Sequence, residues 1–240
     1  MIVVLACTLI GTVTAPAARA ARSFPGARSV GYDVSWPNCG SPQPVQRFAV
    51  VGVTGGLPFT ANPCLVAEFR AAQRTGVAQL YMNIAATGRT TAGMGRTGPA
   101  GACARSAPLC TAHNYGYAAA RAAYSLARSR LGASAVRTTW WLDVEFGPNW
   151  SASPSVNARA VAGALAFLRG RGLPVGIYST AYQWSRIVGR FRPGVPTWYA
   201  TVTRSAAAAR YACTASRSFT GGIVRMVQFA PGGLDADTVC

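Results

Sequence analysis

The sequence has 240 residues, half of them hydrophobic, which is enough chain for one globular domain with a sizeable core. Its 23 basic side chains, all arginine, outnumber six acidic ones and give a net charge of +17. Such a charge fits an anionic cell-wall polymer, membrane surface or nucleic acid, but the arginines form no basic stripe and no nucleic-acid-binding motif accompanies them. We therefore interpret the arginine excess first as a compositional bias and expect no specific nucleic-acid partner.

Residues 1–20 are predicted to be a signal peptide. The apolar stretch 2–13 has the right length, and Ala18-Arg19-Ala20 is the small-x-small pattern that signal peptidase cleaves. The alternative, a lipoprotein acylation site at Val4-Leu5-Ala6-Cys7, places the cysteine too near the start to follow a normal apolar segment. No later segment reaches the ~20 apolar residues of a membrane span. We expect residues 21–240 to form one secreted domain, with association to the cell wall as a further possibility.

Strand patterns alternate with helical patterns along the mature chain, which predicts βα units around a parallel sheet. Helices are expected around Leu65, Phe69 and Ala72 up to Gly76, over 114–131, about 156–168 and about 182–188. A Gly/Thr/Ala/Pro-rich insertion at roughly 87–112 is long enough to be a functional loop. Eight strands are expected, at 29–35, 48–54, 78–85, 138–146, 174–179, 197–202, 223–229 and about 234–239. Elements in this order predict an α/β fold closed as a TIM-like (β/α) barrel.

Six cysteines remain after removal of the signal peptide, and an even number in an exported chain predicts disulfides. Six cysteines can pair in many ways, and the sequence alone does not select one. Proximity along the predicted elements favours Cys39–Cys64, Cys103–Cys110 and Cys213–Cys240.

Metal and cofactor motifs are not evident. No cysteine pair has CxxC spacing, and the single histidine, His113, leaves little for a zinc site or a Ser-His-Asp triad. We expect His113 in a polar loop that leads into a helix. Gly93-Met94-Gly95 lacks the strand-to-helix context and the full spacing of a nucleotide-binding loop. We expect no cofactor and no metal.

Five of the six acidic residues occur at or just past the predicted ends of three strands, where barrel enzymes assemble their active sites. They are Asp33 in the first strand, Asp143 and Glu145 in the fourth, and Asp235 and Asp237 in the last, and only Glu68 falls on a helix. Asp143 and Glu145 are two residues apart on one strand, so their side chains point to the same side.

Crowded carboxylates resist simultaneous ionisation, and one of them can remain protonated at neutral pH. Glycosidic cleavage uses such a set: one acid protonates the leaving oxygen, and another carboxylate serves as nucleophile, base or stabiliser. The alternative is a structural role, in which Asp143 binds backbone amides and Glu145 pairs with an arginine.

At these residues the chain resembles glycoside hydrolase family 25, the lysozymes that act as N-acetylmuramidases. The similar segments follow the family's order over nearly the whole mature chain. They are Gly31-Tyr32-Asp33-Val34-Ser35, Trp141-Leu142-Asp143-Val144-Glu145, Gly176-Ile177-Tyr178-Ser179, Thr197-Trp198-Tyr199-Ala200, Val227-Gln228-Phe229 and Leu234-Asp235.

The resemblance implies a (β/α)5(β)3 barrel, with substrate in a groove across the carboxyl ends of the strands. It makes Glu145 the general acid and gives Asp143 the role of orienting the N-acetyl group and stabilising the developing positive charge. Asp33 and Asp235 complete the acidic cluster, with Asp237 a second candidate for the last position. The resemblance further implies that Tyr178, Trp198 and Gln228 line the sugar site, although ordinary core packing would also explain the two aromatic residues.

Three segments depart from the family pattern. Val53-Thr54-Gly55-Gly56 stands where these lysozymes place Thr-Glu-Gly, and Met82-Asn83-Ile84-Ala85 replaces a Tyr-His-Phe type segment. Val227 and Phe229 replace the Trp and Tyr that flank the glutamine. These differences indicate a divergent relative with altered specificity or no hydrolysis.

The leading hypothesis is an exported monomeric glycosidase that cleaves peptidoglycan or a related amino-sugar polymer and has a cell-wall glycan as its partner. A catalytically inactive cell-wall carbohydrate-binding protein on the same fold is the first alternative. A barrel recruited for protein contacts, with Asp143 and Glu145 merely structural, is the second, and it predicts no affinity for glycans.

Overall fold

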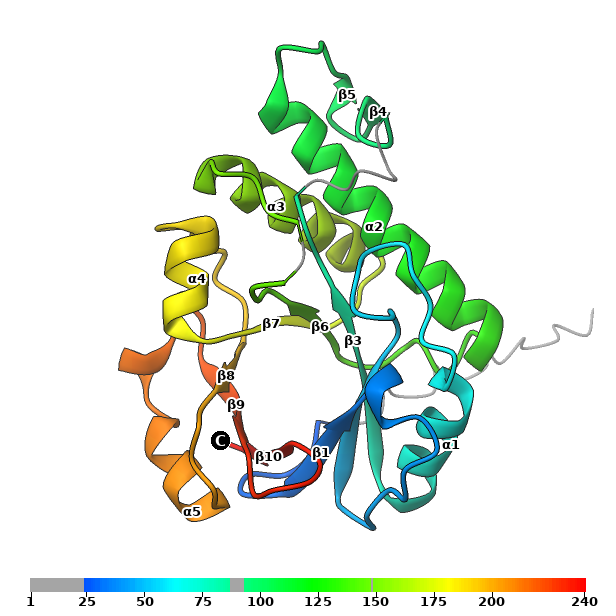
Figure 1. Ribbon diagram of the computed structural model, residues 1–240, viewed down its shortest axis with the longest axis vertical. Coiled ribbons are helices and arrows are strands. Elements are labelled where there is room, and N and C mark those ends of the chain that lie inside the picture. Colours follow the sequence, from blue (N-terminus) through cyan, green and yellow to red (C-terminus); the bar gives the residue numbers. More distant parts are fainter. Residues whose placement is uncertain (1–23, 87–92, 148) are drawn as a thin grey trace, which may run out of the picture.

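The computed structural model describes residues 24–86, 93–147 and 149–240, and eight of its strands form a closed barrel (Figure 1). Their order around the barrel is β1-β10-β9-β8-β7-β6-β3-β2. The strands are β1 (Val30–Val34), β2 (Phe48–Gly52), β3 (Val77–Asn83), β6 (Trp140–Asp143), β7 (Val175–Ser179), β8 (Thr197–Ala200), β9 (Val224–Phe229) and β10 (Ala236–Val239). The predicted TIM-like (β/α) barrel is confirmed, with most strands a few residues shorter than expected. The predicted signal peptide lies outside the described residues.

Strand β10 runs against the direction of the others. It pairs antiparallel with both β1 and β9, whereas the remaining neighbours around the barrel pair in parallel. The expectation that Asp235 and Asp237 lie at the carboxyl end of the last strand is therefore wrong, because they precede and begin β10. Reversal of this strand nevertheless brings its beginning to the barrel end where the parallel strands finish.

Helical segments cover the outside of the barrel (Figure 1). A 3-10 turn, η1, follows β1, and each of the next four strands of the barrel is followed by one α-helix, which gives five βα units before the last three strands. A short helix that was not expected, α5, precedes β9. The bounds are η1 (Trp36–Asn38), α1 (Leu65–Thr75), α2 (Pro108–Leu131), α3 (Pro154–Gly170), α4 (Ala181–Val188), α5 (Ala206–Ala209), η3 (Arg210–Ala212) and η4 (Ala215–Arg217).

Helix α2 begins at Pro108 rather than at the expected residue 114. Proline suits the first turn of a helix because its backbone lacks the N–H that would be unpaired there. His113 consequently lies on the helix and not in a loop, which corrects that prediction.

The insertion after β3 is fastened to the start of α2. Its hairpin, β4 (Thr97–Gly98) with β5 (Gly101–Ala102), projects away from the barrel beside that end of the helix (Figure 1). The Cys103–Cys110 disulfide joins it to the first turn of α2. The Asn114 amide also donates hydrogen bonds to the backbone oxygens of Gly95 and Gly101.

Helices α2 and α3 touch through their backbones. A Cβ on Gly116 would lie 1.8 Å from the Ala160 carbonyl oxygen, and one on Gly163 would lie 1.9 Å from that of His113. No larger residue fits at either glycine without separating the helices.

The barrel interior is filled by an aromatic layer separate from the core between barrel and helices. Trp141 and Trp198 pack edge to face with their ring centroids 5.6 Å apart. Gly176 leaves room for this packing, because a Cβ there would lie 2.2 Å from the Trp141 ring. The buried members of the layer are Phe48, Val50, Trp141, Trp198, Met226 and Val239.

The three disulfides favoured from the sequence, Cys39–Cys64, Cys103–Cys110 and Cys213–Cys240, are present. Cys39–Cys64 joins the segment after η1 to the start of α1. Cys213–Cys240 joins the end of η3 to the residue after β10. Among the described residues, none of the helices combines the length and the hydrophobicity of a membrane span.

Candidate active site

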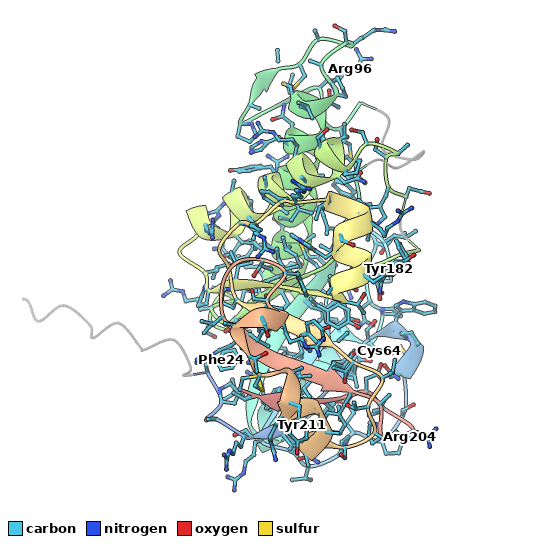
Figure 2. All side chains as sticks on the ribbon, turned by 90° about the vertical axis from the view of Figure 1, so that its left-hand side faces the viewer. Phe24, Cys64, Arg96, Tyr182, Arg204 and Tyr211 are labelled. Carbon is cyan, nitrogen blue, oxygen red and sulfur yellow. A yellow bond between two sulfur atoms is a disulfide. The ribbon has the colours of Figure 1, made fainter. Side chains whose placement is uncertain are left out.

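A cavity of about 270 Å³ opens at the barrel end where the parallel strands finish. Figure 2 views the barrel from the side, with Phe24 at one end and Tyr182, Cys64 and Arg204 toward the cavity end. The cavity is lined by Asp33, Ser35, Pro37, Asn38, Tyr81, Asp143, Glu145, Tyr178, Trp198, Gln228 and Asp235. Every predicted site residue except Asp237 is therefore in its wall.

The register of the strands determines which side chains form the floor of the cavity. Asn83, Asp143 and Tyr178 are direct partners across β3, β6 and β7, so their side chains form one row. Strand β6 ends at Asp143, and Glu145 lies just past it rather than within the strand as predicted. The Glu145 backbone oxygen accepts a hydrogen bond from Trp150 Nε1 at 2.9 Å, which helps to hold the loop.

The carboxyl groups of Asp143 and Glu145 lie close enough together in the cavity wall for each to affect the pKa of the other. Two carboxylates held near each other resist simultaneous ionisation, which favours a state in which one of them carries a proton. Burial is the main cause that raises the pKa of both groups, and the neighbouring charges of Glu145 and Asp33 raise that of Asp143 further. Asp143 is 5% exposed and Glu145 is more accessible, so Glu145 is the better placed to reach a ligand.

The structural alternative for this pair does not match these contacts. Asp143 Oδ2 accepts a hydrogen bond from the Asn83 side-chain amide at 2.5 Å rather than from a backbone amide. The ionisable groups that affect the pKa of Glu145 are the carboxylates Asp143 and Asp235, not an arginine.

A second network joins Asp33 to the opposite wall. Tyr178 donates its hydroxyl to Gln228 Oε1 at 2.9 Å, and Gln228 Nε2 donates to Asp33 Oδ2 at 2.9 Å. Burial raises the pKa of Asp33 to about 7, although the bond from Gln228 acts against this rise and the nearby Asp235 adds to it. Asp33 thus titrates near neutral pH.

Asp237 lies behind Asp33 and has no exposed surface. Its Oδ1 accepts from Trp198 Nε1 at 2.7 Å, and the neighbouring Asp33 raises its pKa further. Burial raises its pKa well above the ordinary value. Direct contact with a sugar, as expected for Asp237, is not available to a side chain buried in this way, so its role becomes support of Asp33 and Trp198. Asp235, by contrast, lies exposed at the cavity mouth, and partial burial raises its pKa.

Part of the cavity lining was not predicted from the sequence. Tyr81 is hydrogen-bonded to Ser35, and its ring meets that of Trp198 edge to face at 6.3 Å. Tyr81 stands two residues before Asn83 on the same strand, so the two-residue period could have identified it. Two exposed aromatic rings, Phe146 next to Glu145 and Tyr182 at the start of α4, also pack edge to face at 6.0 Å.

Potential metal ligands converge elsewhere. Within the described ranges, the one group of three candidate ligand side chains comprises Cys39, Cys64 and Glu68. Both sulfurs form a disulfide and offer no thiolate. Glu68 is buried and accepts a hydrogen bond from Asn62 Nδ2 at 2.7 Å, which indicates a structural role.

Comparison with known proteins gives matches in sequence and in fold. The family model described as "Lysozyme-like protein 1" matches residues 107–221. Two curated proteins of Dictyostelium discoideum, "Probable GH family 25 lysozyme 2" and "Probable GH family 25 lysozyme 4", are 39% and 37% identical over 62 residues. The matched segment covers 25% of this chain and 29% of each relative, so the chain spans under a third of the length of these relatives.

Solved structures with a similar fold cover most of the chain. The catalytic domain of endolysin ply40 from bacteriophage P40 of Listeria monocytogenes has a TM-score of 0.52 at 14% identity, and the match covers 89% of this chain and 93% of that domain. The modular Cpl-1 endolysin, solved in complex with a peptidoglycan analogue, has a TM-score of 0.53 at 17% identity, covering 89% of this chain and 54% of the endolysin. At such identities the likeness concerns the fold.

Proposed function

Because this chain is a member of the glycoside hydrolase family 25-type lysozyme superfamily, we propose that it is a secreted hydrolase that cleaves peptidoglycan or a related amino-sugar polymer. The observation that carries the proposal is the placement of the neighbouring Asp143 and Glu145 carboxyl groups, both with a raised pKa, in a cavity lined by aromatic and amide side chains. A glycosidase needs a carboxylic acid that remains protonated near neutral pH, and burial raises the pKa of both carboxyl groups in that direction here. The structure of Cpl-1 with a peptidoglycan analogue supports a cell-wall glycan as the ligand class.

In the proposed reaction Glu145 donates its proton to the glycosidic oxygen as the bond from that oxygen to the anomeric carbon breaks. The positive charge that develops on the sugar is stabilised by the neighbouring carboxylates Asp143 and Asp33. Either a carboxylate or the acetamido group of the substrate occupies the second catalytic role. Water then adds to the anomeric carbon and returns a proton to Glu145, which restores the starting state.

The aromatic walls suit a sugar ligand. Tyr178 and Trp198 meet edge to face at 4.6 Å, and Gln228 is held between Tyr178 and Asp33, so this wall is rigid before any ligand binds. Aromatic faces pack against the apolar faces of sugars, and the amide offers hydrogen bonds to hydroxyl groups. Export is supported by the three disulfides, which persist in oxidising compartments.

The test is release of reducing ends from purified peptidoglycan by residues 21–240, beside a Glu145→Gln variant, in low and moderate salt. Glutamine keeps the size and polarity of the side chain but has no acidic proton. We expect release to fall by about 10²–10⁴-fold while pelleting with the wall is retained. Equal release by both proteins would exclude Glu145 as the acid.

A second candidate function is a cell-wall carbohydrate-binding protein without hydrolysis. It is favoured by Gly55, which stands where the related lysozymes carry an acid and leaves that side of the cavity without a carboxylate. In that case neither protein releases reducing ends, but both pellet with the wall. A barrel used only for protein contacts would do neither.

A further inference from the structure

Two buried side chains behind the cavity form a relay to Asp143. Thr54 follows β2 and Asn83 ends β3. Thr54 Oγ1 accepts a hydrogen bond from the Asn83 backbone N–H at 3.0 Å and donates its own hydroxyl proton to Asn83 Oδ1 at 2.7 Å. Asn83 Nδ2 then donates to Asp143 Oδ2 at 2.5 Å. Each step joins residues from a different strand or strand end.

The relay fixes the direction of the Asn83 amide. The Thr54 hydroxyl has one proton, and the backbone N–H occupies its oxygen as acceptor, so the proton points to Asn83. An amide whose oxygen receives that proton must present its NH₂ group to Asp143. Since NH₂ only donates, Asp143 Oδ2 must accept. A proton on Asp143 therefore belongs on Oδ1, which among the described residues has no N–H or hydroxyl donor.

We propose that Asn83, locked by Thr54, is a positioning residue of the acid pair, which keeps Asp143 Oδ2 unprotonated and confines any proton on Asp143 to Oδ1. The catalytic use of this proton by Glu145 rests on the proposed function. The position of the proton does not, because it is a property of the protein without substrate.

Other charged and titratable groups around Asp143 remain in place when the relay is altered. They are Glu145 from the loop after β6, Asp33 from β1, Tyr81 from β3 and Tyr178 from β7. Asn83 lies in a segment that departs from the family pattern.

The decisive variant is Thr54→Val, which keeps the side-chain shape and removes the hydroxyl without touching Asp143. The released amide can turn its oxygen toward Asp143 Oδ2, and that arrangement favours a protonated Asp143. We expect the titration midpoint of the Asp143–Glu145 pair, measured by carbon-13 NMR of the carboxyl groups, to rise by about one pH unit. The value of kcat should fall about tenfold with little change in KM, and the pH profile should move in the same direction.

Thr54→Ser retains a hydroxyl and should restore the native midpoint. Asn83→Leu, which removes the donor itself, provides the same test if Thr54→Val does not fold. A folded Thr54→Val protein with the native midpoint and pH profile would overturn the relay while leaving the proposed function standing. If no protein in the series hydrolyses glycan, the NMR midpoints still decide the relay, and only the proposed function fails.

Discussion

The cavity end of the barrel and the rest of the surface carry opposite charges. Four of the six acidic side chains line the cavity, Asp237 lies directly behind it, and Glu68 is buried on α1. Arginines, in contrast, are spread over the exterior, and apart from Asp235 at the mouth the surface has no exposed acidic side chain. Apart from Asp235, the carboxylates lie where burial makes their ionisation costly. Solubility would demand the reverse, so this placement points to a chemical role for the interior.

The largest effect is expected from Asp33→Asn. It removes one interior charge and should reduce hydrolysis by about 100-fold or more, since Asp33 faces the Asp143–Glu145 pair. The same change should stabilise the fold at pH 8 by about 2–4 kcal/mol, because the buried Asp33 has its pKa raised to about 7.

The pH dependence of this stabilisation follows from the direction of the pKa shift. Because the unfolded chain ionises Asp33 near pH 4 and the folded protein only near pH 7, the native protein loses stability as the pH rises between these values. Urea unfolding at pH 4, 6 and 8 measures the difference between variant and native protein. If the difference in unfolding free energy between the two proteins did not grow with pH, the raised pKa of a buried Asp33 carboxyl group would be contradicted.

A smaller effect is expected from Asp237→Asn. Trp198 Nε1 requires an acceptor, so the new amide should place its oxygen there and present its NH₂ group to Asp33. A permanent donor favours ionised Asp33, and its titration midpoint should fall from about 7 by about one pH unit, with activity changed less than tenfold. Carbon-13 NMR of Asp33 measures the midpoint. Asp237→Leu, which also leaves Trp198 without an acceptor, should cost more stability than Asp237→Asn.

The smallest effects concern the exterior. Arg190, Arg192 and Arg217 line a groove beside α4, whereas Arg121, Arg128 and Arg130 are exposed on α2. Replacing either set by glutamine changes the charge equally. If the arginines act through the summed field, both triple variants should pellet with anionic wall material a few-fold more weakly at low salt, and the loss should vanish at high salt. If only the groove variant pelleted more weakly, the groove arginines would form a defined binding site, and the summed charge of the surface would not explain the binding.

Much of the barrel could be predicted because the patterns that indicate its strands and helices lie within short segments of the sequence. Apolar runs of strand length and helical periodicity predicted all eight barrel strands and four of the helices. The carboxylates at strand ends predicted the cavity, since the ends of parallel strands meet at one edge. The start of α2 was missed because Pro108 and Cys110 stand in a segment with loop-like composition. The two-residue strands β4 and β5 are too short for a periodic signal.

The remaining features of the site depend on the register and the direction of the strands, which the sequence of a single segment does not reveal. The reversal of β10 decides that Asp237 lies behind Asp33, and no pattern within residues 234–239 indicates it. Thr54, Asn83 and Asp143 meet because three strand ends align, although the sequence showed only that the segments of Thr54 and Asn83 were unusual.

Closure of the barrel between β1 and β10 also determines when the site can exist. Asp33 and Gln228 are separated by 195 residues, and Asp237 reaches Asp33 only through the pairing of the first and last strands of the barrel. Contacts between sequential neighbours such as α2 and α3 form early in folding, whereas contacts of such long separation form late. A chain still being synthesised or translocated can therefore have helices and most of a sheet while it lacks a complete acidic cluster. We expect the proposed hydrolytic capacity to arise only in the last step of folding.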